Sequence, residues 1–355
     1  MPIYQTASFS HPALGQSTGF DYSRTSNPTR LALEETLAGA DGGFKGFAFA
    51  SGLAAIDTVL HLFKAGDRLL VTEDLYGGTF RLLDKVFRPL GFDAIYVDTS
   101  NIEAVKEALR QPGVKGIFIE TPSNPLLRIA DIRAIASLAR PHGILTIVDN
   151  TFLTPVSQRP LALGADITVY SATKYLAGHN DVVAGAVVVN TPELAERIGF
   201  FQNAIGAILG PQDSWLTLRG LKTLPLRIHK QQENAGRIAT WLGTHPHVRR
   251  VYYPGLPSHP GRDILDREHL GFGSMVAFEV DSASRIPGIL SGVKVFLFAE
   301  SLGGVESLIT YPAVQTHADI APDIRDRLGI NDRLLRLSIG IEDGNDLIND
   351  LAAIL

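Results

Sequence analysis

The chain has 355 residues, a formal net charge of −5 and no cysteine. Disulfides and thiolate metal sites are therefore excluded, and without a basic block there is no reason to expect a nucleic-acid partner. Hydrophobic residues make up 45% of the chain and no apolar run reaches membrane-spanning length, so we expect a cytoplasmic protein outside the membrane. The opening residues, MPIYQTASFS, do not have the character of a chain start, and we expect a trimmed or renumbered N-terminus.

Short apolar runs alternate with helix-period segments in the first half of the chain. In chain order the expected strands are 44–50, 68–72, 94–97, 114–120, 144–149, 167–171 and 182–189. After the first of them, one helix face is formed by Leu53, Ile56, Leu60 and Phe63. Near-continuous Val and Ile runs separated by helices predict a mostly parallel sheet covered on both faces. Ligands bind such sheets beyond the carboxyl ends of the strands.

The character of the sequence changes around residue 222. A long helical stretch is expected at 226–243, mixed strands at 248–254, 275–280 and 334–342, and a closing helix at 343–355. We therefore expect an N-terminal arm, a large α/β domain and a smaller α/β C-terminal domain, at 1–28, 29–222 and 223–355.

Polar residues follow three of the expected strands. Ser51, Gly52 and Leu53 follow the first strand and open a helix, whose first N–H groups offer an anion site; an ordinary capped turn is the alternative interpretation. Asp149 ends another strand and could bind a ligand or cap a helix. Metal binding would need further carboxylate or histidine ligands clustered near Asp149, and the sequence places none there.

The third polar segment follows strand 167–171. The hydroxyls of Ser171 and Thr173 are two residues apart and can face one anion. Lys174 comes next, and a lysine in an apolar sheet environment loses solvation of its charged form, which lowers its pKa and makes it a usable nucleophile. The alternative interpretation is a lysine whose ammonium reaches solvent.

Together these groups match one ligand, pyridoxal 5′-phosphate (PLP). A phosphate suits the helix N-terminus and the two hydroxyls. The pyridine nitrogen needs a carboxylate, which Asp149 supplies, and the aldehyde needs a desolvated amine, which Lys174 supplies.

Eight motifs extend this pattern along essentially the whole chain: DYSRTSNPTR (21–30), FASGLAAI (49–56), DLYGGTFRLLD (74–84), ETPSNP (120–125), VDNTF (148–152), YSATKYLAGHNDVVAG (170–185), FAESLGGVESLITYPA (298–313) and LLRLSIGIED (334–343). In these motifs the sequence resembles the Cys/Met-metabolism PLP enzymes. The resemblance implies an α/β, PLP-dependent transferase fold of type I, similar to that of aspartate aminotransferase.

The resemblance also implies roles for individual residues. Lys174 would carry the cofactor and, with Tyr76, act in catalysis. The other cofactor contacts would be ring stacking by Tyr76, a nitrogen contact by Asp149, phosphate contacts from Gly52, Leu53, Ser171 and Thr173, and phosphate contacts across a subunit interface from Tyr22 and Arg24. The substrate α-carboxylate would be bound by Asn124 and Arg336 with Ser301 assisting, although an exposed strand arginine is an alternative interpretation of Arg336.

Three further residues bear on the reaction. Glu300 matches an acid that γ-synthases and γ-lyases carry, Asp21 would add a second acid at the pocket mouth, and Arg81 would bind a distal carboxylate unless it is a helix-surface charge. The pattern is most similar to bacterial cystathionine γ-synthases, which implies γ-replacement on O-succinyl- or O-acetylhomoserine by L-cysteine to give cystathionine. The alternatives are cystathionine γ-lyase, O-acetylhomoserine sulfhydrylase and a PLP-binding module without turnover. The expected partners are small amino-acid substrates and other copies of the chain, in a homotetramer built as a dimer of dimers with shared active sites.

Overall fold

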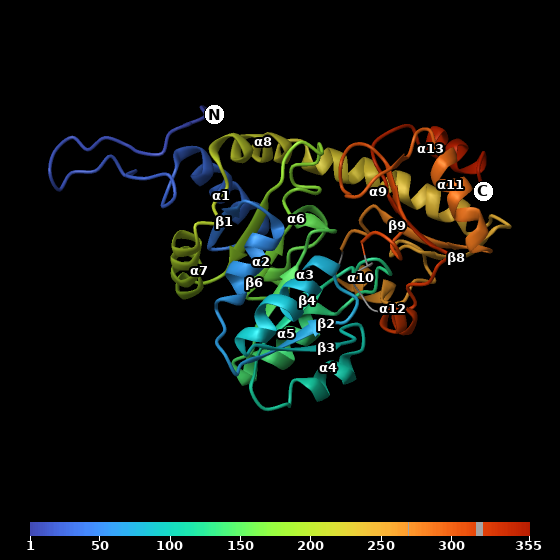
Figure 1. The fold of residues 1–355 in the computed structure, drawn as a ribbon, viewed down its shortest axis with the longest axis horizontal. Helices are drawn as coiled ribbons and strands as arrows, with labels where there is room; N and C mark the ends of the chain where they lie inside the picture. The colour runs from blue at the N-terminus through green and yellow to red at the C-terminus, as the bar shows by residue number, and fades with distance from the viewer. Residues whose placement is uncertain (269, 317–321) are drawn as a thin grey trace.

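The computed structural model describes residues 1–268, 270–316 and 322–355 (Figure 1). All seven strands expected in the first half are present and form one sheet in the order β1-β7-β6-β5-β4-β2-β3. Only β7 runs antiparallel to its neighbours in this sheet, so the expectation of a mostly parallel sheet is confirmed. The bounds are β1 Lys45–Phe49, β2 Arg68–Thr72, β3 Asp93–Val97, β4 Val114–Glu120, β5 Leu145–Asp149, β6 Ile167–Tyr170 and β7 Gly185–Val189.

Both faces of this sheet are buried by helices. Successive strand residues point to opposite sides, so neighbouring residues of one strand pack into different clusters. In β5, Ile147 packs into a cluster with helices α2 (Gly52–Leu60) and α7 (Pro192–Ile205). Its neighbour Val148 packs on the other side with α4 (Ile102–Ala108) and α5 (Ile132–Ala139). The expected helix after β1 is shorter than its pattern indicated, since α2 ends at Leu60 and Phe63 lies beyond it.

The second half of the chain forms a five-stranded sheet in the order β10-β11-β12-β9-β8. Helix α9 (Leu224–Leu242) runs along the molecule toward this sheet (Figure 1) and packs on it together with α13 (Gly344–Ala352). The strands are β8 Val248–Tyr252, β9 Met275–Val280, β10 Leu297–Phe298, β11 Leu308–Thr310 and β12 Leu334–Ser338, of which β10 and β11 were not expected from the sequence.

The remaining helices are α1 Pro28–Asp41, α3 Gly77–Arg81, α6 Thr154–Ser157, α8 Pro211–Leu221, α10 Arg262–Arg267, α11 Ile286–Gly292 and α12 Pro322–Leu328. Among the described residues, no helix is both long and apolar enough to span a bilayer. The domain boundaries drawn from the sequence stay an interpretation.

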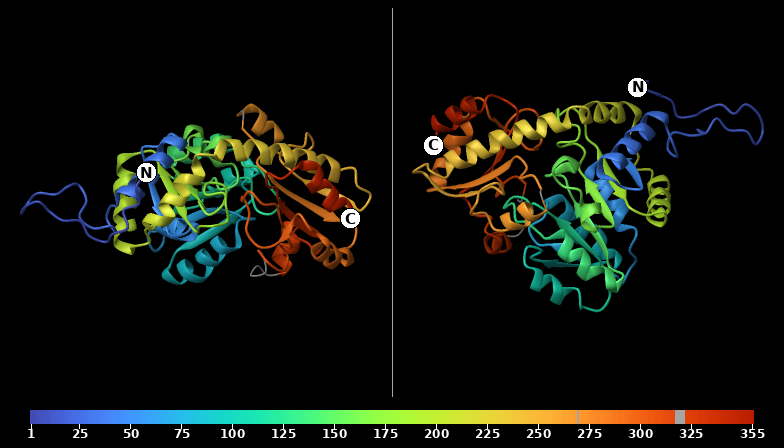
Figure 2. Two further views of the ribbon diagram at one scale, coloured as in Figure 1. Left: turned by 90° about the horizontal axis from the view of Figure 1, so that it is seen from above. Right: turned by 180° about the vertical axis from the view of Figure 1, so that it is seen from behind.

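The N-terminal arm projects from the body of the molecule in every view (Figures 1 and 2). It folds back on itself through an antiparallel bridge between Ser8 and Tyr22. Leu14, near its tip, is fully exposed, and the Tyr22 ring is nearly half exposed. The arm ends where Asn27 caps α1 by accepting a 2.9 Å hydrogen bond from the Thr29 N–H.

Candidate functional site

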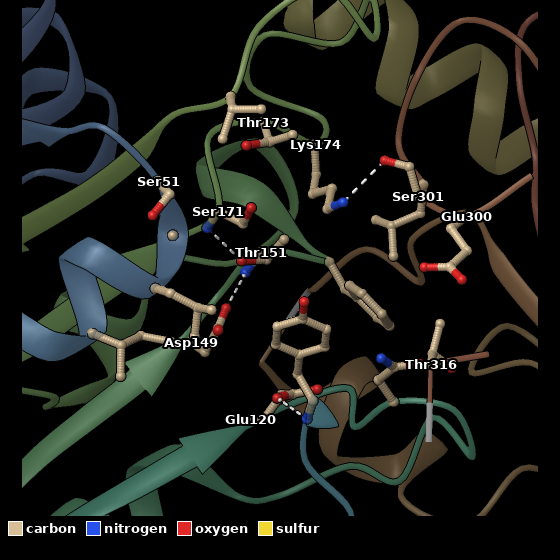
Figure 3. Close-up of a pocket in the computed structure, with 18 of the residues that line it drawn as sticks. Ser51, Glu120, Asp149, Thr151, Ser171, Thr173, Lys174, Glu300, Ser301 and Thr316 are labelled. Carbon is tan, nitrogen blue, oxygen red and sulfur yellow. Dashed lines mark hydrogen bonds between the residues drawn. The ribbon is translucent and has the colours of Figure 1, made fainter. Parts of the chain in front are cut away.

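A pocket of about 370 Å³ lies at the carboxyl edge of the first sheet (Figure 3). Residues that end or follow β1, β2, β4, β5 and β6 line one side, and residues from the second half of the chain line the other. The structure brings most of the candidate residues together here: Gly52, Leu53, Tyr76, Asn124, Asp149, Ser171, Thr173, Lys174, Glu300, Ser301 and Arg336.

One end of the pocket is built to receive an anion. Ser51 caps α2 by accepting a 3.0 Å hydrogen bond from the Ala54 N–H. The N–H groups of Gly52 and Leu53 lie in the first turn of the helix and therefore have no intrahelical acceptor. A Cβ on Gly52 would lie 2.9 Å from the Cβ of Ser171. Glycine therefore lets the helix N-terminus approach the Ser171 hydroxyl closely, so that both can face one anion.

The two hydroxyls after β6 differ in their hydrogen bonding. Ser171 lines the pocket, and its backbone N–H, not its hydroxyl, donates to Thr151 Oγ1 at 2.8 Å. Thr173 Oγ1 instead donates to the Ala184 carbonyl at 3.1 Å and accepts from the Ala184 N–H at 2.9 Å. To donate to an anion, the Thr173 hydroxyl would have to give up its bond to that carbonyl.

Two carboxyl groups form the floor of the pocket. Asp149, at the end of β5, accepts a 3.0 Å hydrogen bond from the Thr151 N–H (Figure 3). Burial raises its pKa, and the hydrogen bonds from Thr151 oppose that rise. Glu120, at the end of β4, is the register partner of Asp149 and is only 6% exposed. Burial, and then the charge of Asp149, raises the pKa of Glu120 well above its ordinary range.

Lys174 reaches across the pocket toward the second half of the chain. Its Nζ donates a 2.9 Å hydrogen bond to Ser301 Oγ (Figure 3). Burial, and then the positive charge of Arg336, lowers the pKa of Lys174 to about 8. With this pKa about a tenth of the amine is uncharged at pH 7, far more than for an ordinary lysine with a pKa of about 10.4, and the neutral form is the one that acts as a nucleophile or base.

Ser301 has an unusual backbone conformation. Its φ angle is +119°, a region in which side-chain-bearing residues are strained by roughly 1–3 kcal/mol. The same residue presents its hydroxyl to Lys174 and its carbonyl to Arg336, at 2.9 Å and 3.2 Å respectively. The strain therefore coincides with a residue that contacts both cations of the pocket.

Arg336 is a buried cation rather than an exposed strand arginine. It is 2% exposed on β12, and its NH1 donates to Asn124 Oδ1 at 2.8 Å. Its Nε is buried without a partner, and no carboxylate among the described residues forms an ion pair with it. Burial lowers the pKa of Arg336 to about 10, which still leaves the guanidinium charged at neutral pH. A buried cation without a carboxylate partner suits an anionic ligand.

Tyr76 and Glu300 lie at the exposed part of the pocket. Tyr76 is the N-cap residue of α3 and is 42% exposed, while its backbone N–H donates to Glu120 Oε2 at 2.9 Å. A Cβ at residue 78 would come within 2.3 Å of the Tyr76 ring, so Gly78 leaves room for the ring where it lies. Glu300 is exposed beside Ser301.

Four candidate residues do not line the pocket of their own chain. Arg81 lies at the exposed end of α3. Asp21 stays within the arm, where it accepts a hydrogen bond from Ser17 and lies 3.2 Å from His11. Arg24 donates to Asn203 at 2.7 and 2.9 Å and lies over the ring of Tyr22. A role for these arm residues in a neighbour's site stays a prediction.

The sequence reasoning missed several lining residues, among them Glu120, Thr151, Phe152, Val183, Leu302 and Thr316. A signal existed for Glu120, which ends a buried strand in the same way as Asp149. Thr151 lies in the VDNTF motif, but only the fold shows that it joins Asp149 to Ser171 through its hydrogen bonds.

These groups fit PLP. The Gly52 cradle and the Ser171 hydroxyl suit its phosphate, Asp149 its pyridine nitrogen and Lys174 its aldehyde. Within the described ranges, no cluster of three or more histidine, aspartate or glutamate side chains could hold a metal ion.

Comparison with known proteins agrees with this fit. The chain is 52% identical over 351 residues to a cystathionine β-lyase of Lactococcus lactis subsp. cremoris, covering 99% of this chain and 92% of the relative. It is 50% identical over 355 residues to a cystathionine γ-lyase of Bacillus subtilis, covering 100% and 93%. The crystal structure of cystathionine γ-synthase from Xanthomonas oryzae pv. oryzae, in complex with aminoacrylate and cysteine, matches with a TM-score of 0.97 at 45% identity, covering 99% and 91%. The family model described as "Cys/Met metabolism PLP-dependent enzyme" matches residues 1–355, and the chain belongs to this family of fold-type-I PLP enzymes.

Proposed function

We propose that this PLP-dependent enzyme makes or breaks the Cγ–S bond of L-cystathionine. The observation that supports this most directly is the arrangement of charge in the pocket. A buried cation, Arg336, lies deep in it, and a carboxyl group, Glu300, lies at its exposed mouth. Cystathionine carries an α-carboxylate at one end and a second ammonium group at the other, so it complements both.

When bound, PLP supplies an electron sink for negative charge that develops on the substrate. The side chains of the pocket would do the remaining work. Asp149 would hold the pyridine nitrogen, and Arg336 with Asn124 would orient the substrate carboxylate. Lys174, with a pKa of about 8, can accept a proton near neutral pH and return it nearby, as a base serving adjacent carbon atoms must. Tyr76 would cover the exposed side.

The synthetic direction is the first candidate. In it L-cysteine replaces the acyloxy group of an O-acylhomoserine, giving cystathionine and the free acid. The motif pattern around Asp21 and Glu300 favours this reaction, and the chain's likeness to the Xanthomonas oryzae γ-synthase structure supports it.

Cleavage of cystathionine is the second candidate. Two relatives are named lyases, one a γ-lyase at 50% identity, which favours γ-cleavage, and one a β-lyase at 52% identity, which favours β-cleavage. γ-Cleavage gives cysteine, 2-oxobutyrate and ammonia. β-Cleavage gives homocysteine, pyruvate and ammonia. The reactions differ in which carbon–sulfur bond breaks, and therefore in the keto acid released.

One product analysis decides among these reactions. The purified holoenzyme is incubated with L-cystathionine alone, and separately with L-cysteine plus O-succinyl- or O-acetylhomoserine. Cystathionine formed in the second incubation supports γ-replacement, and 2-oxobutyrate in the first supports γ-cleavage. Pyruvate as the main product would overturn the proposed γ-chemistry. The homotetramer with shared sites and the cytoplasmic location expected from the sequence stay predictions.

A further inference from the structure

Glu120 places a second carboxyl group beside Asp149. The two residues are register partners at the ends of the parallel strands β4 and β5. Paired residues of neighbouring strands point to the same face of a sheet, and both side chains line the pocket. Besides Glu300, the pocket thus holds two carboxyl groups from neighbouring strand ends, whereas the pyridine nitrogen of the cofactor needs one.

The surroundings of Glu120 compensate a negative charge on it only in part. Glu120 Oε2 accepts one hydrogen bond, from the Tyr76 backbone N–H at 2.9 Å, and forms no ion pair with a described residue. The charged groups around it are Asp149 and Asp74, which repel an anion, and Arg336, which attracts one. Lys174 and Glu300 line the same pocket.

The two carboxyl groups are not equivalent. Asp149 accepts a hydrogen bond from the Thr151 N–H and would face a protonated ring nitrogen, and both interactions favour its anion. Two anions side by side in a desolvated pocket are unfavourable, so one carboxyl group retains a proton. Burial, and then the charge of Asp149, raises the pKa of Glu120 well above its ordinary range, which agrees with Glu120 as the carboxyl group that stays protonated.

We propose that Glu120 is a positioning residue that acts as a neutral acid: it anchors the Tyr76 backbone at the cofactor site and leaves Asp149 as the single anion beneath it. The inference rests on the proposed function for its cofactor geometry. It assigns Glu120 no contact with the reacting atoms, since its effect passes through Tyr76 and Asp149.

Cofactor affinity tests the anchoring role. The cofactor-free protein is titrated with PLP, and binding is followed by visible absorbance. Glu120→Leu leaves the Tyr76 N–H without its acceptor, and we expect PLP to bind roughly tenfold more weakly than to wild type, or weaker still. Glu120→Gln offers the same acceptor oxygen without a charge, so it should restore affinity to within about threefold of wild type.

Glu34→Gln is the matched control. Glu34 is also a buried carboxyl group that accepts a backbone N–H, from Ala48 at 3.0 Å, but it lies on α1 outside the pocket. Its substitution should leave PLP affinity unchanged. Wild-type affinity in Glu120→Leu would overturn the anchoring role. Binding as weak in Glu120→Gln as in Glu120→Leu would show that a negative charge is needed at this position.

The pH dependence of stability tests the neutral acid. A carboxyl group whose pKa is raised in the folded state stays protonated there, while the same group ionises in the unfolded chain. The folded protein therefore loses stability as pH rises above about 4.3, the ordinary glutamate pKa, toward the folded pKa. Glu120→Gln lacks this loss. In urea unfolding of the cofactor-free proteins, the unfolding constant of wild type relative to Glu120→Gln should therefore rise by up to about tenfold per pH unit above pH 5.

A ratio that stays flat with pH would overturn the neutral-acid assignment. Neither measurement requires turnover. Failure of the proposed function would appear in the products formed by the wild-type enzyme, whereas failure of this inference would appear in PLP affinity and unfolding.

Discussion

The Nζ of Lys174 donates a 2.9 Å hydrogen bond to Ser301 Oγ, which joins the loop after β6 to the segment between β10 and β11. This contact crosses from one sheet to the other half of the chain, so the reactive amine is positioned by both. Its partner is an uncharged hydroxyl, which stabilises the ammonium less than a carboxylate would. The lowered pKa of about 8 set by burial and Arg336 is thereby preserved.

The first prediction concerns the charge of this amine. In the cofactor-free protein, brief acetylation followed by mass spectrometry should show Lys174 labelling that rises with pH around a midpoint of about 8, because only the neutral amine reacts. An ordinary lysine has a midpoint of about 10.4. Arg336→Leu removes the neighbouring positive charge and should raise the Lys174 midpoint. A Lys174 midpoint above 10 in the wild-type protein would contradict the assignment.

The strand pattern carried most of the information about the large sheet. Runs such as 114–120 and 144–149 are mostly apolar because both sheet faces are buried, and the structure confirms them as β4 and β5. Asp149 and Lys174 could be singled out because polar residues directly after such runs must lie at the ligand-binding edge.

Contacts between distant segments could not be obtained in this way. The burial of Arg336 depends on β12 lying between β11 and β9, and its hydrogen bond to Asn124 spans 212 positions of sequence. The pairing of Glu120 with Asp149 depends on strand register. Neither periodicity nor local spacing encodes these relationships, so the sequence left the exposure of Arg336 open and could not show that Glu120 lies beside Asp149.

The second prediction concerns substrate anchoring. Arg336→Leu should raise KM for L-cystathionine on the order of a hundredfold, because a buried charge-assisted contact to the α-carboxylate is lost. Arg336→Lys should recover part of this loss, since it restores charge but not the planar donor geometry. Steady-state kinetics measure both effects. For a cystathionine analogue amidated at that carboxylate, Arg336→Leu should change KM little, because the analogue has no carboxylate for Arg336 to bind. An equal rise in KM for the amide and for cystathionine would indicate general damage to the site.

The third prediction concerns the arm. Arg24 contacts Asn203 of its own chain and lies outside its own pocket, while the arm projects from the body (Figure 2). If Arg24 completes a neighbour's site, inactive Arg24→Ala and Lys174→Ala chains should complement each other after unfolding and joint refolding. Half of randomly assorted dimers are hybrids with one intact site, so about a quarter of wild-type activity should return. Verified hybrids without activity would count against shared sites.

The last prediction concerns substrate choice by Glu300. Its exposed carboxyl group lies beside Ser301 at the pocket mouth, where a bound substrate would shield it partly from water. A distal ammonium could then form a charge-assisted hydrogen bond with it. Because exposed pairs are weaker than buried ones, we expect Glu300→Val to lower kcat/KM for cystathionine by roughly tenfold to a hundredfold.

The same substitution should change kcat/KM for methionine or homocysteine much less, since these substrates share the chemistry at Lys174 but have no distal amine. Glu306→Gln is the matched control, because Glu306 is also exposed but bonds Asn180 outside the pocket; it should leave the ratio of the two kcat/KM values unchanged. An equal fall for both substrate classes in Glu300→Val would make Glu300 a structural residue. The choice of cystathionine would then have to come from other residues that line the pocket.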